Sequence, residues 1–102
     1  MFRHIFIASA FAAGSGENLD FVVQTLATIP TIIPTVRRFS VAKNAGLSGE
    51  PAGIVMVADF DSAADWQDYM QNEQHLALGE HIKPYIDLSD MTVTQYFFNQ
   101  GE

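Results

Sequence analysis

One short run of residues, "IVMVADF" at 54–60, limits the possible folds of this chain more than any other feature. It reads as a β-strand, and the side chains of a strand point alternately to opposite faces of its sheet. One face would carry Ile54, Met56, Ala58 and Phe60, and the other would carry Val55 and Val57. A sheet that is covered on one face only usually alternates apolar with polar residues. This strand therefore predicts a sheet that is buried on both faces.

The predicted first strand, "RHIFIASAF" at 3–11, has the same two-sided character. Its alternation places Phe2, His4, Phe6 and Ala8 on one face, and Ile5 and Ile7 on the other. In the strand 54–60, Asp59 is the one charged residue of an otherwise apolar run. We interpret Asp59 as a charge at an edge or at a pocket mouth, paired with Arg37 or Arg38.

Helices and further strands are predicted around these two strands. Leu19, Val22, Val23 and Leu26 recur at helical spacing, which predicts a helix over 16–28 with Ser15 as its N-cap. The prolines of "IPTIIPT" end that helix. "VRRFSVAK" (36–43) and "DMTVTQYFF" (90–98) predict two more strands, and Asp61 is the expected N-cap of a second helical region.

The resulting order, β-α-β-β-α-β, is that of a ferredoxin-like α+β fold, with helices on one face of a four-stranded antiparallel sheet. A chain of 102 residues is expected to form a single domain, 1–102. The helices cover one face of a sheet that is apolar on both, so the second face needs another cover. A second copy of the sheet is the simplest cover, and we therefore expect a homodimer closed into an α/β barrel.

The second helical region is predicted to break near Asn72. On an unbroken helix Tyr69 and His75 would lie about 120° apart, because six residues advance the helix by about 600°. Asn72 is a good N-cap, with Glu73 in the following turn, and this predicts separate helices over 61–71 and 73–83. His75 then lies at the centre of an apolar stripe with Leu78, Gly79 and Ile82, and His81 lies at its border. The break is compatible with Tyr69 and His75 pointing to one place, although the spacing does not require it.

Composition excludes several classes of function. The chain has no cysteine, so disulfides and thiolate metal sites are excluded, and a cytoplasmic location is expected. A net charge of −7 repels phosphate backbones and anionic membrane surfaces, so we expect neither a nucleic-acid nor a membrane partner. The histidines lack metal-ligand spacing, and no nucleotide-binding or nucleophile motif is present. Neither a metal nor a cofactor is therefore expected.

Three segments resemble the stress-responsive A/B barrel family, the dimeric α+β barrel proteins. They are "FRHIFIASAF", "VADFDSAADWQDYMQNEQH" and "HLALGEHIKPYIDLSDMTVTQYFF", and together they span nearly the whole chain. The most telling features are Arg3-His4, Phe60-Asp61 and the six-residue spacing from Tyr69 to His75. Where the family usually has a proline two residues before that histidine, this chain has Glu73.

The resemblance implies a homodimer whose two sheets face one another and close a barrel. Some members of the family are stress-associated proteins without known chemistry, and a plant relative is a cofactor-free polyketide cyclase. In such enzymes the histidine that matches His75 is the general base, the tyrosine that matches Tyr69 orients the substrate, and the histidine that matches His4 lines the pocket. The resemblance also implies that the face carrying His4 is the barrel interior, whereas the residues alone allow a helix-covered face equally well.

Three hypotheses for function follow. The leading one is binding of a small, largely hydrophobic molecule between sheet and helices, with cofactor-free acid–base chemistry by His75, Tyr69 and His4. The second is a non-catalytic stress or accessory dimer, in which His75 is a core histidine satisfied by a backbone carbonyl and Tyr69 is an amphipathic core residue. The third is a cofactor-independent monooxygenase of the related barrel type. A fold alone does not decide among them.

Overall fold

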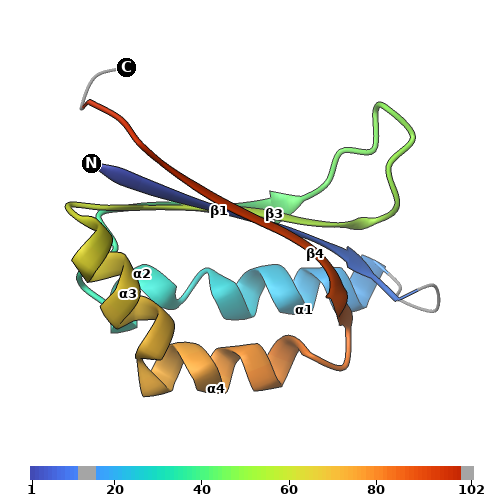
Figure 1. Ribbon diagram of the computed structural model, residues 1–102. Coiled ribbons are helices and arrows are strands. Elements are labelled where there is room, and N and C mark those ends of the chain that lie inside the picture. The colour runs from blue at the N-terminus through green and yellow to red at the C-terminus, as the bar shows by residue number, and fades with distance from the viewer. Residues whose placement is uncertain (12–15, 100–102) are drawn as a thin grey trace.

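A computed structural model describes residues 1–11 and 16–99 of the chain (Figure 1). The elements in chain order are β1 (Phe2–Ala10), α1 (Gly16–Leu26), α2 (Ile29–Ile32), β2 (Arg38–Lys43), β3 (Gly53–Phe60), α3 (Ala63–Gln71), α4 (Glu73–Ile82) and β4 (Ile86–Phe97). The predicted ferredoxin-like order is confirmed, and the second helical region is divided as expected. The predicted N-cap Ser15 lies outside the described residues.

The four strands form one antiparallel sheet in the order β2-β3-β1-β4. The two central strands, β1 and β3, are the two whose sequences are apolar on both faces. All four described helices lie on the same side of this sheet (Figure 1). The hydrophobic core therefore lies between the sheet and the helices.

The sheet contributes to this core the side chains on its helix-covered face, which are every second residue of β1 and β3. Phe2, His4 and Ala8 of β1 are buried, as are Ile54, Met56, Ala58 and Phe60 of β3. They pack against a helical layer that contributes Leu19, Val22, Leu26, Ile29, Tyr69 and Ile82. The predicted stripe of the first helix is thus confirmed, with Val23 only partly buried against the core.

The opposite side of the sheet is not covered by any described helix. It carries Ile5 and Ile7 of β1 and Val55 and Val57 of β3, and we call this surface the open face. Ile7 keeps 39% of its surface exposed, and the other three residues are half-buried. Within the described residues no helix is long and apolar enough to cross a membrane.

One local prediction is wrong. The N-cap of α3 is Ser62, whose hydroxyl accepts a hydrogen bond from the Asp65 backbone N–H at 3.1 Å. Asp61, the predicted cap, instead forms an ion pair with Arg37 at 2.9 Å. The first helix ends at Leu26, before the prolines, as predicted. A separate short helix, α2, follows it, and Pro30 is tolerated in its first turn because the backbone N–H groups there have no partner within the helix.

Candidate functional site

The break between α3 and α4 is made by the side chain of Asn72. This residue has an extended backbone conformation, with φ −65° and ψ 131°. Its Oδ1 accepts hydrogen bonds from the backbone N–H groups of Gln74 (2.8 Å) and His75 (3.2 Å). The N-cap therefore starts a second helix, α4, whose axis differs in direction from that of α3 (Figure 1). Glu73 stands in the first turn of α4, where a carboxylate suits the helix dipole.

The change of direction brings Tyr69 and His75 together. Their rings lie 4.2 Å apart between centroids, at an interplanar angle of 37°. Tyr69 is 1% exposed at the end of α3, and His75 is half-buried in the first turn of α4. His81, also on α4, is exposed. The two residues singled out by their spacing are thus in direct contact.

His4 joins this pair from the sheet. It is 3% exposed on the helix-covered side of β1, and its ring lies 6.2 Å from that of Tyr69 and 5.9 Å from that of Trp66. The expectation that the His4 face is the barrel interior is therefore wrong, because this is the face packed under the helices. The physical reason for the error is that both faces of β1 are apolar, so the alternation alone does not tell them apart.

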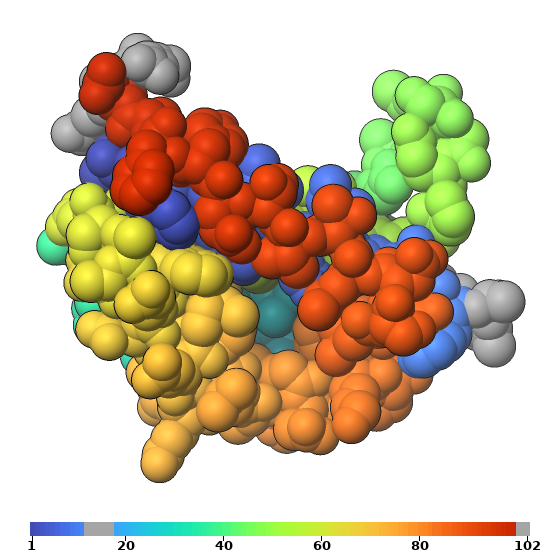
Figure 2. Space-filling view, in the orientation of Figure 1, coloured from blue at the N-terminus to red at the C-terminus, as the bar shows by residue number. Residues whose placement is uncertain are grey.

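The three side chains line one cavity of about 200 Å³ between the sheet and the helices. Its lining residues are His4, Phe6, Leu26, Met56, Tyr69, Met70, His75, Leu78, Gly79, Ile82, Leu88, Met91 and Val93. Figure 2 shows the opening between β4 (red-orange) and α4 (orange), with deeper teal atoms at its floor. Apart from the two imidazoles and the phenol, the described lining is apolar, and no charged side chain belongs to it.

Polar atoms at this cavity are buried without a hydrogen-bond partner among the described protein groups. They are the Tyr69 hydroxyl and Nδ1 of His75, and the indole Nε1 of the neighbouring Trp66 is in the same condition. Buried polar atoms in folded proteins are nearly always hydrogen-bonded, and leaving one unpaired costs about 1–3 kcal/mol. Two polar atoms of one apolar cavity, the Tyr69 hydroxyl and Nδ1 of His75, are thus left without a partner among the described groups.

The burial of the site keeps both histidines neutral. Burial, and to a smaller extent the nearby His75, lower the pKa of His4 to about 4. Burial also lowers the pKa of His75, against an opposing effect from a hydrogen bond with the Met70 backbone. Burial raises the pKa of Tyr69, which therefore keeps its proton. At neutral pH the cavity contains two uncharged imidazoles and one phenol.

These pKa shifts predict a loss of stability in mild acid. Between about pH 6.5 and pH 4 the unfolded chain protonates His4 while the folded chain does not, so the free energy of unfolding falls as the pH is lowered through this window. The contribution of His4 is at most about 3 kcal/mol. Urea unfolding at several pH values should show a smaller fall in His4→Gln than in the natural protein. The matched change of an exposed histidine, His81→Gln, should leave the fall unaltered, and equal falls in all three proteins would contradict the assignment.

Sequence reasoning missed one polar residue of the site, Gln95. It lies directly opposite His4 in the pairing of β1 with β4, and its Nε2 is 3.0 Å from Nδ1 of His4. A signal for it is present in the sequence, because Gln95 is the polar member of an otherwise apolar alternation formed by Met91, Val93 and Phe97. The strand begins at Ile86 and not at the predicted residue 90. Its alternation over residues 91–97 is the same with either start.

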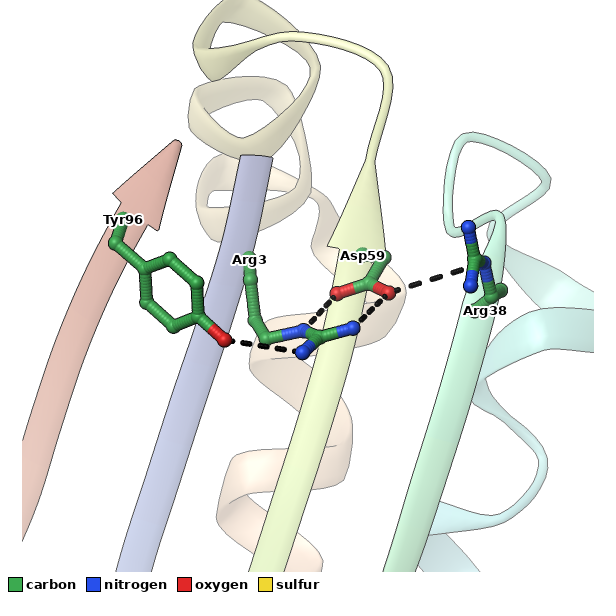
Figure 3. A network of polar contacts seen from close by, with 4 residues as sticks. All are labelled: Arg3, Arg38, Asp59 and Tyr96. Carbon is green, nitrogen blue, oxygen red and sulfur yellow. Dashed lines mark hydrogen bonds and ion pairs between the residues drawn. The ribbon is translucent and has the colours of Figure 1, made fainter. Parts of the chain in front are cut away.

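A separate polar network crosses the open face (Figure 3). Arg3 donates from Nε and from one terminal nitrogen to the two carboxylate oxygens of Asp59, at 2.7 and 2.9 Å, and from the other to the Tyr96 hydroxyl at 3.0 Å. Arg38 lies 4.0 Å from Asp59 on the other side. Asp59 is 2% exposed on a central strand, so the interpretation of it as an edge charge is wrong. Arg3 is its main partner. Of the two predicted arginines, Arg38 approaches the carboxylate with its side chain, whereas Arg37 donates its backbone N–H to the Asp59 carbonyl oxygen and pairs its side chain with Asp61.

Metal-ligating side chains do not converge elsewhere in the described part of the chain. No group of three or more His, Asp or Glu residues is placed there to hold a metal ion.

Solved structures with the same architecture cover nearly the whole chain. A protein of Arabidopsis thaliana is 15% identical over 100% of this chain and 99% of its own, with a TM-score of 0.82. A dimeric ferredoxin-like protein of unknown function from Thermobifida fusca is 22% identical over 95% and 90%, with a TM-score of 0.81. The hydroxynitrile lyase of Passiflora edulis is 17% identical over 97% and 94%, with a TM-score of 0.79. At such low identities these likenesses establish the fold alone.

The sequence itself gives the family. None of the curated proteins is significantly similar to this chain. The sequence profile of the Stress responsive A/B Barrel Domain, however, matches residues 2–98. Because that match spans almost the entire length, the chain belongs to the stress responsive A/B barrel domain family.

Proposed function

We propose that this chain forms a homodimeric α/β barrel that binds a small, largely hydrophobic molecule in the cavity of each subunit and performs cofactor-free acid–base chemistry on it. The observation that carries the proposal is the pair of unpartnered polar atoms, the Tyr69 hydroxyl and Nδ1 of His75, at one apolar cavity. A ligand with a polar group at one end would provide the missing hydrogen bonds, and its apolar body would fill the rest.

The size and the lining of the cavity limit the ligand. An apolar cavity of about 150 Å³ is large enough to bind benzene. The volume of about 200 Å³ found here accommodates a molecule with one ring or a short alkyl chain. A charged ligand would lose its hydration without gaining an opposite charge, since no charged side chain is among the described lining residues. The ligand is therefore an uncharged molecule with a carbonyl or hydroxyl group.

The three polar side chains have complementary roles toward a carbonyl compound. His75 is a neutral imidazole whose Nδ1 is unpaired, so it can take a proton from the carbon next to the carbonyl. The electron pair of that C–H bond then moves to the carbonyl oxygen. Tyr69 keeps its proton and donates a hydrogen bond to this oxygen, with His4 beside it, so that the developing negative charge is stabilised in a site of low polarity.

The homodimer is supported by the open face. Ile5, Ile7, Val55 and Val57 form an apolar surface on the two central strands, and the described helices all lie on the opposite side. A second copy offers the same apolar, twisted surface, and self-complementary pairing of one patch is the usual way in which symmetric dimers form. The Thermobifida fusca protein with this fold is dimeric.

Ligand binding can be tested with three molecules of nearly the same shape. Acetophenone carries a carbonyl group, α-methylstyrene replaces the oxygen with a CH2 group, and benzoate carries a negative charge. We expect acetophenone to bind, α-methylstyrene to bind roughly two- to tenfold more weakly because a hydrogen bond is worth about 0.5–1.5 kcal/mol, and benzoate not to bind measurably.

The methionine methyl groups provide the measurement and its internal control. Met56, Met70 and Met91 line the cavity, whereas Met1 does not. In NMR spectra of protein labelled at the methionine methyls, acetophenone should shift the signals of the three lining residues and leave that of Met1 in place. Absence of any shift at millimolar acetophenone, or equal binding of all three molecules, would rule out the proposed ligand class.

The variant Tyr69→Phe is expected to stabilise the ligand-free protein by about 1 kcal/mol, because it removes a buried hydroxyl that has no partner. Urea unfolding measures this change. The matched variant Tyr96→Phe removes a hydroxyl that accepts a hydrogen bond from Arg3 at 3.0 Å, and it should not stabilise the protein. A loss of stability in Tyr69→Phe would show that its hydroxyl is part of the core and is not reserved for a ligand.

A non-catalytic binding dimer is the second candidate function. The feature that favours it is the influence of the Met70 backbone, which opposes burial by raising the pKa of the His75 imidazole, as a partner in a protein core would. The two candidates share the cavity and differ in chemistry, so binding of acetophenone without any exchange of its α-protons would favour the second.

A further inference from the structure

We propose that Gln95 fixes the proton of His4 on Nε2, and thereby makes His4 a hydrogen-bond donor at the cavity and leaves the role of base to His75. Gln95 is therefore a positioning residue, because it affects a ligand in the cavity only by setting the proton position of His4. The location of the proton is a property of the ligand-free protein, whereas its consequence for chemistry rests on the proposed function.

The argument begins with the contact between the two side chains. The nitrogen of the Gln95 side-chain amide, Nε2, lies 3.0 Å from Nδ1 of His4. An amide nitrogen carries two protons and can only donate a hydrogen bond. Nδ1 of His4 must therefore be the acceptor, and it is bare. A neutral imidazole carries one proton, which is then on Nε2.

The backbone holds this contact in place. His4 and Gln95 are paired residues of β1 and β4, so their side chains stand on the same face of the sheet and side by side. On both strands the neighbouring pairs, Phe2 with Phe97 and Phe6 with Val93, continue the same face. The register thus places the polar pair His4 and Gln95 between two apolar pairs. In these surroundings each of the two side chains needs the other as its hydrogen-bond partner.

The charge state of His4 agrees with this arrangement. Burial lowers the pKa of His4 to about 4, so the ring is neutral at pH 7 and has a single proton to place. The titratable groups that face it from the helical layer are Tyr69 of α3 and His75 of α4. Arg3 and Asp59 belong to the open face on the other side of the sheet. No described carboxylate is thus in position to draw the proton to Nδ1.

The two histidines that line the cavity would therefore have different roles, His4 as a hydrogen-bond donor and His75 as a base. Nδ1 of His4 is occupied by Gln95, and its Nε2 already carries a proton, so His4 can give a hydrogen bond to a ligand but cannot accept a proton from it. His75 differs from His4 because no side chain occupies its Nδ1, and in the form with the proton on Nε2 this nitrogen is free to accept a proton. An oxygen of the ligand is therefore expected to face His4 and Tyr69, and the proton to be removed is expected to face His75.

The test measures the proton directly. In 15N NMR spectra of the ligand-free protein at pH 7, protonated and bare ring nitrogens give well-separated signals, and the signals of His4 are identified by their loss in His4→Phe. We expect Nε2 of His4 to be protonated and Nδ1 to be bare. A proton on Nδ1 would overturn the proposal without any variant having to fold.

Three variants then test the cause. Gln95→Glu places an acceptor at Nδ1 and should draw the proton there, with the titration midpoint of His4 rising by about 1 to 3 pH units. Gln95→Met removes the donor and should produce a mixture of the two neutral forms. Gln24→Glu makes the same change at an exposed position of α1 and should alter nothing. An unchanged His4 in Gln95→Glu would also overturn the proposal.

Acetophenone separates this proposal from the proposed function. Gln95→Glu should weaken its binding, because a bare Nε2 would face the carbonyl oxygen. If acetophenone does not bind the natural protein while His4 carries its proton on Nε2, the proposed ligand is wrong and the role of Gln95 stands. If acetophenone binds and the proton is on Nδ1, the role of Gln95 is wrong and the proposed function stands.

Discussion

His75→Ala is expected to reduce the exchange of acetophenone α-protons with solvent deuterium by about 10²–10⁴-fold, the usual loss when a general base is removed. The reaction needs no cofactor, because a base removes the proton, the electron pair rests on the carbonyl oxygen, and a deuteron from D2O returns to carbon. NMR follows the disappearance of the methyl proton signal.

Two comparisons make this result specific. His81→Ala changes an exposed histidine of the same helix and should keep the natural exchange rate. Tyr69→Phe should lose less than His75→Ala, because it removes one hydrogen bond and keeps the packing. The fold of His75→Ala should remain intact, since residue 75 takes part in the cap of α4 through its backbone N–H and not through its side chain. A melting temperature lower by several degrees, together with an unchanged exchange rate, would identify His75 as a core residue.

Val55→Lys is expected to dissociate the proposed dimer, with a dissociation constant raised by about 10³-fold or more. Val55 lies near the middle of the open face, between Ile7 of β1 and Ala42 of β2. A lysine there would be buried in the interface without a counter-charge, which costs several kcal/mol, and two-fold symmetry would introduce it twice. Light scattering over a dilution series should give the mass of two chains for the natural protein and of one chain for the variant.

The control for this change is Gln24→Lys, which adds the same charge at an exposed position of α1 on the helical side. It should remain a dimer. A lysine at Met56 would not serve, because Met56 is buried under the helices and its replacement would disturb the core of the single chain. A Val55→Lys protein that keeps the mass of two chains at low micromolar concentration would place the partner elsewhere or show that there is none.

Local features of the sequence sufficed for the order of the elements and for the break in the second helical region. Strand alternation and helical periodicity depend on neighbouring residues, so they can be read from a short window. The capping role of Asn72 is equally local, because its side chain bonds to the backbone two and three residues later. For the same reason the stripe of α4 with His75 at its centre was predictable, and it lines the cavity as expected.

What the sequence by itself determined is thus the set of elements, their polarity patterns and the helix break that allows Tyr69 and His75 to meet. Only the tertiary structure decided which face of the sheet the helices cover, because β1 and β3 are apolar on both faces and their alternation fits either choice. It also decided the partners of Asp59 and His4. Arg3 reaches Asp59, and Gln95 reaches His4, because strand order and register set these residues side by side across 56 and 91 positions of the chain. Such contacts depend on how distant segments pair, and no local pattern contains that information.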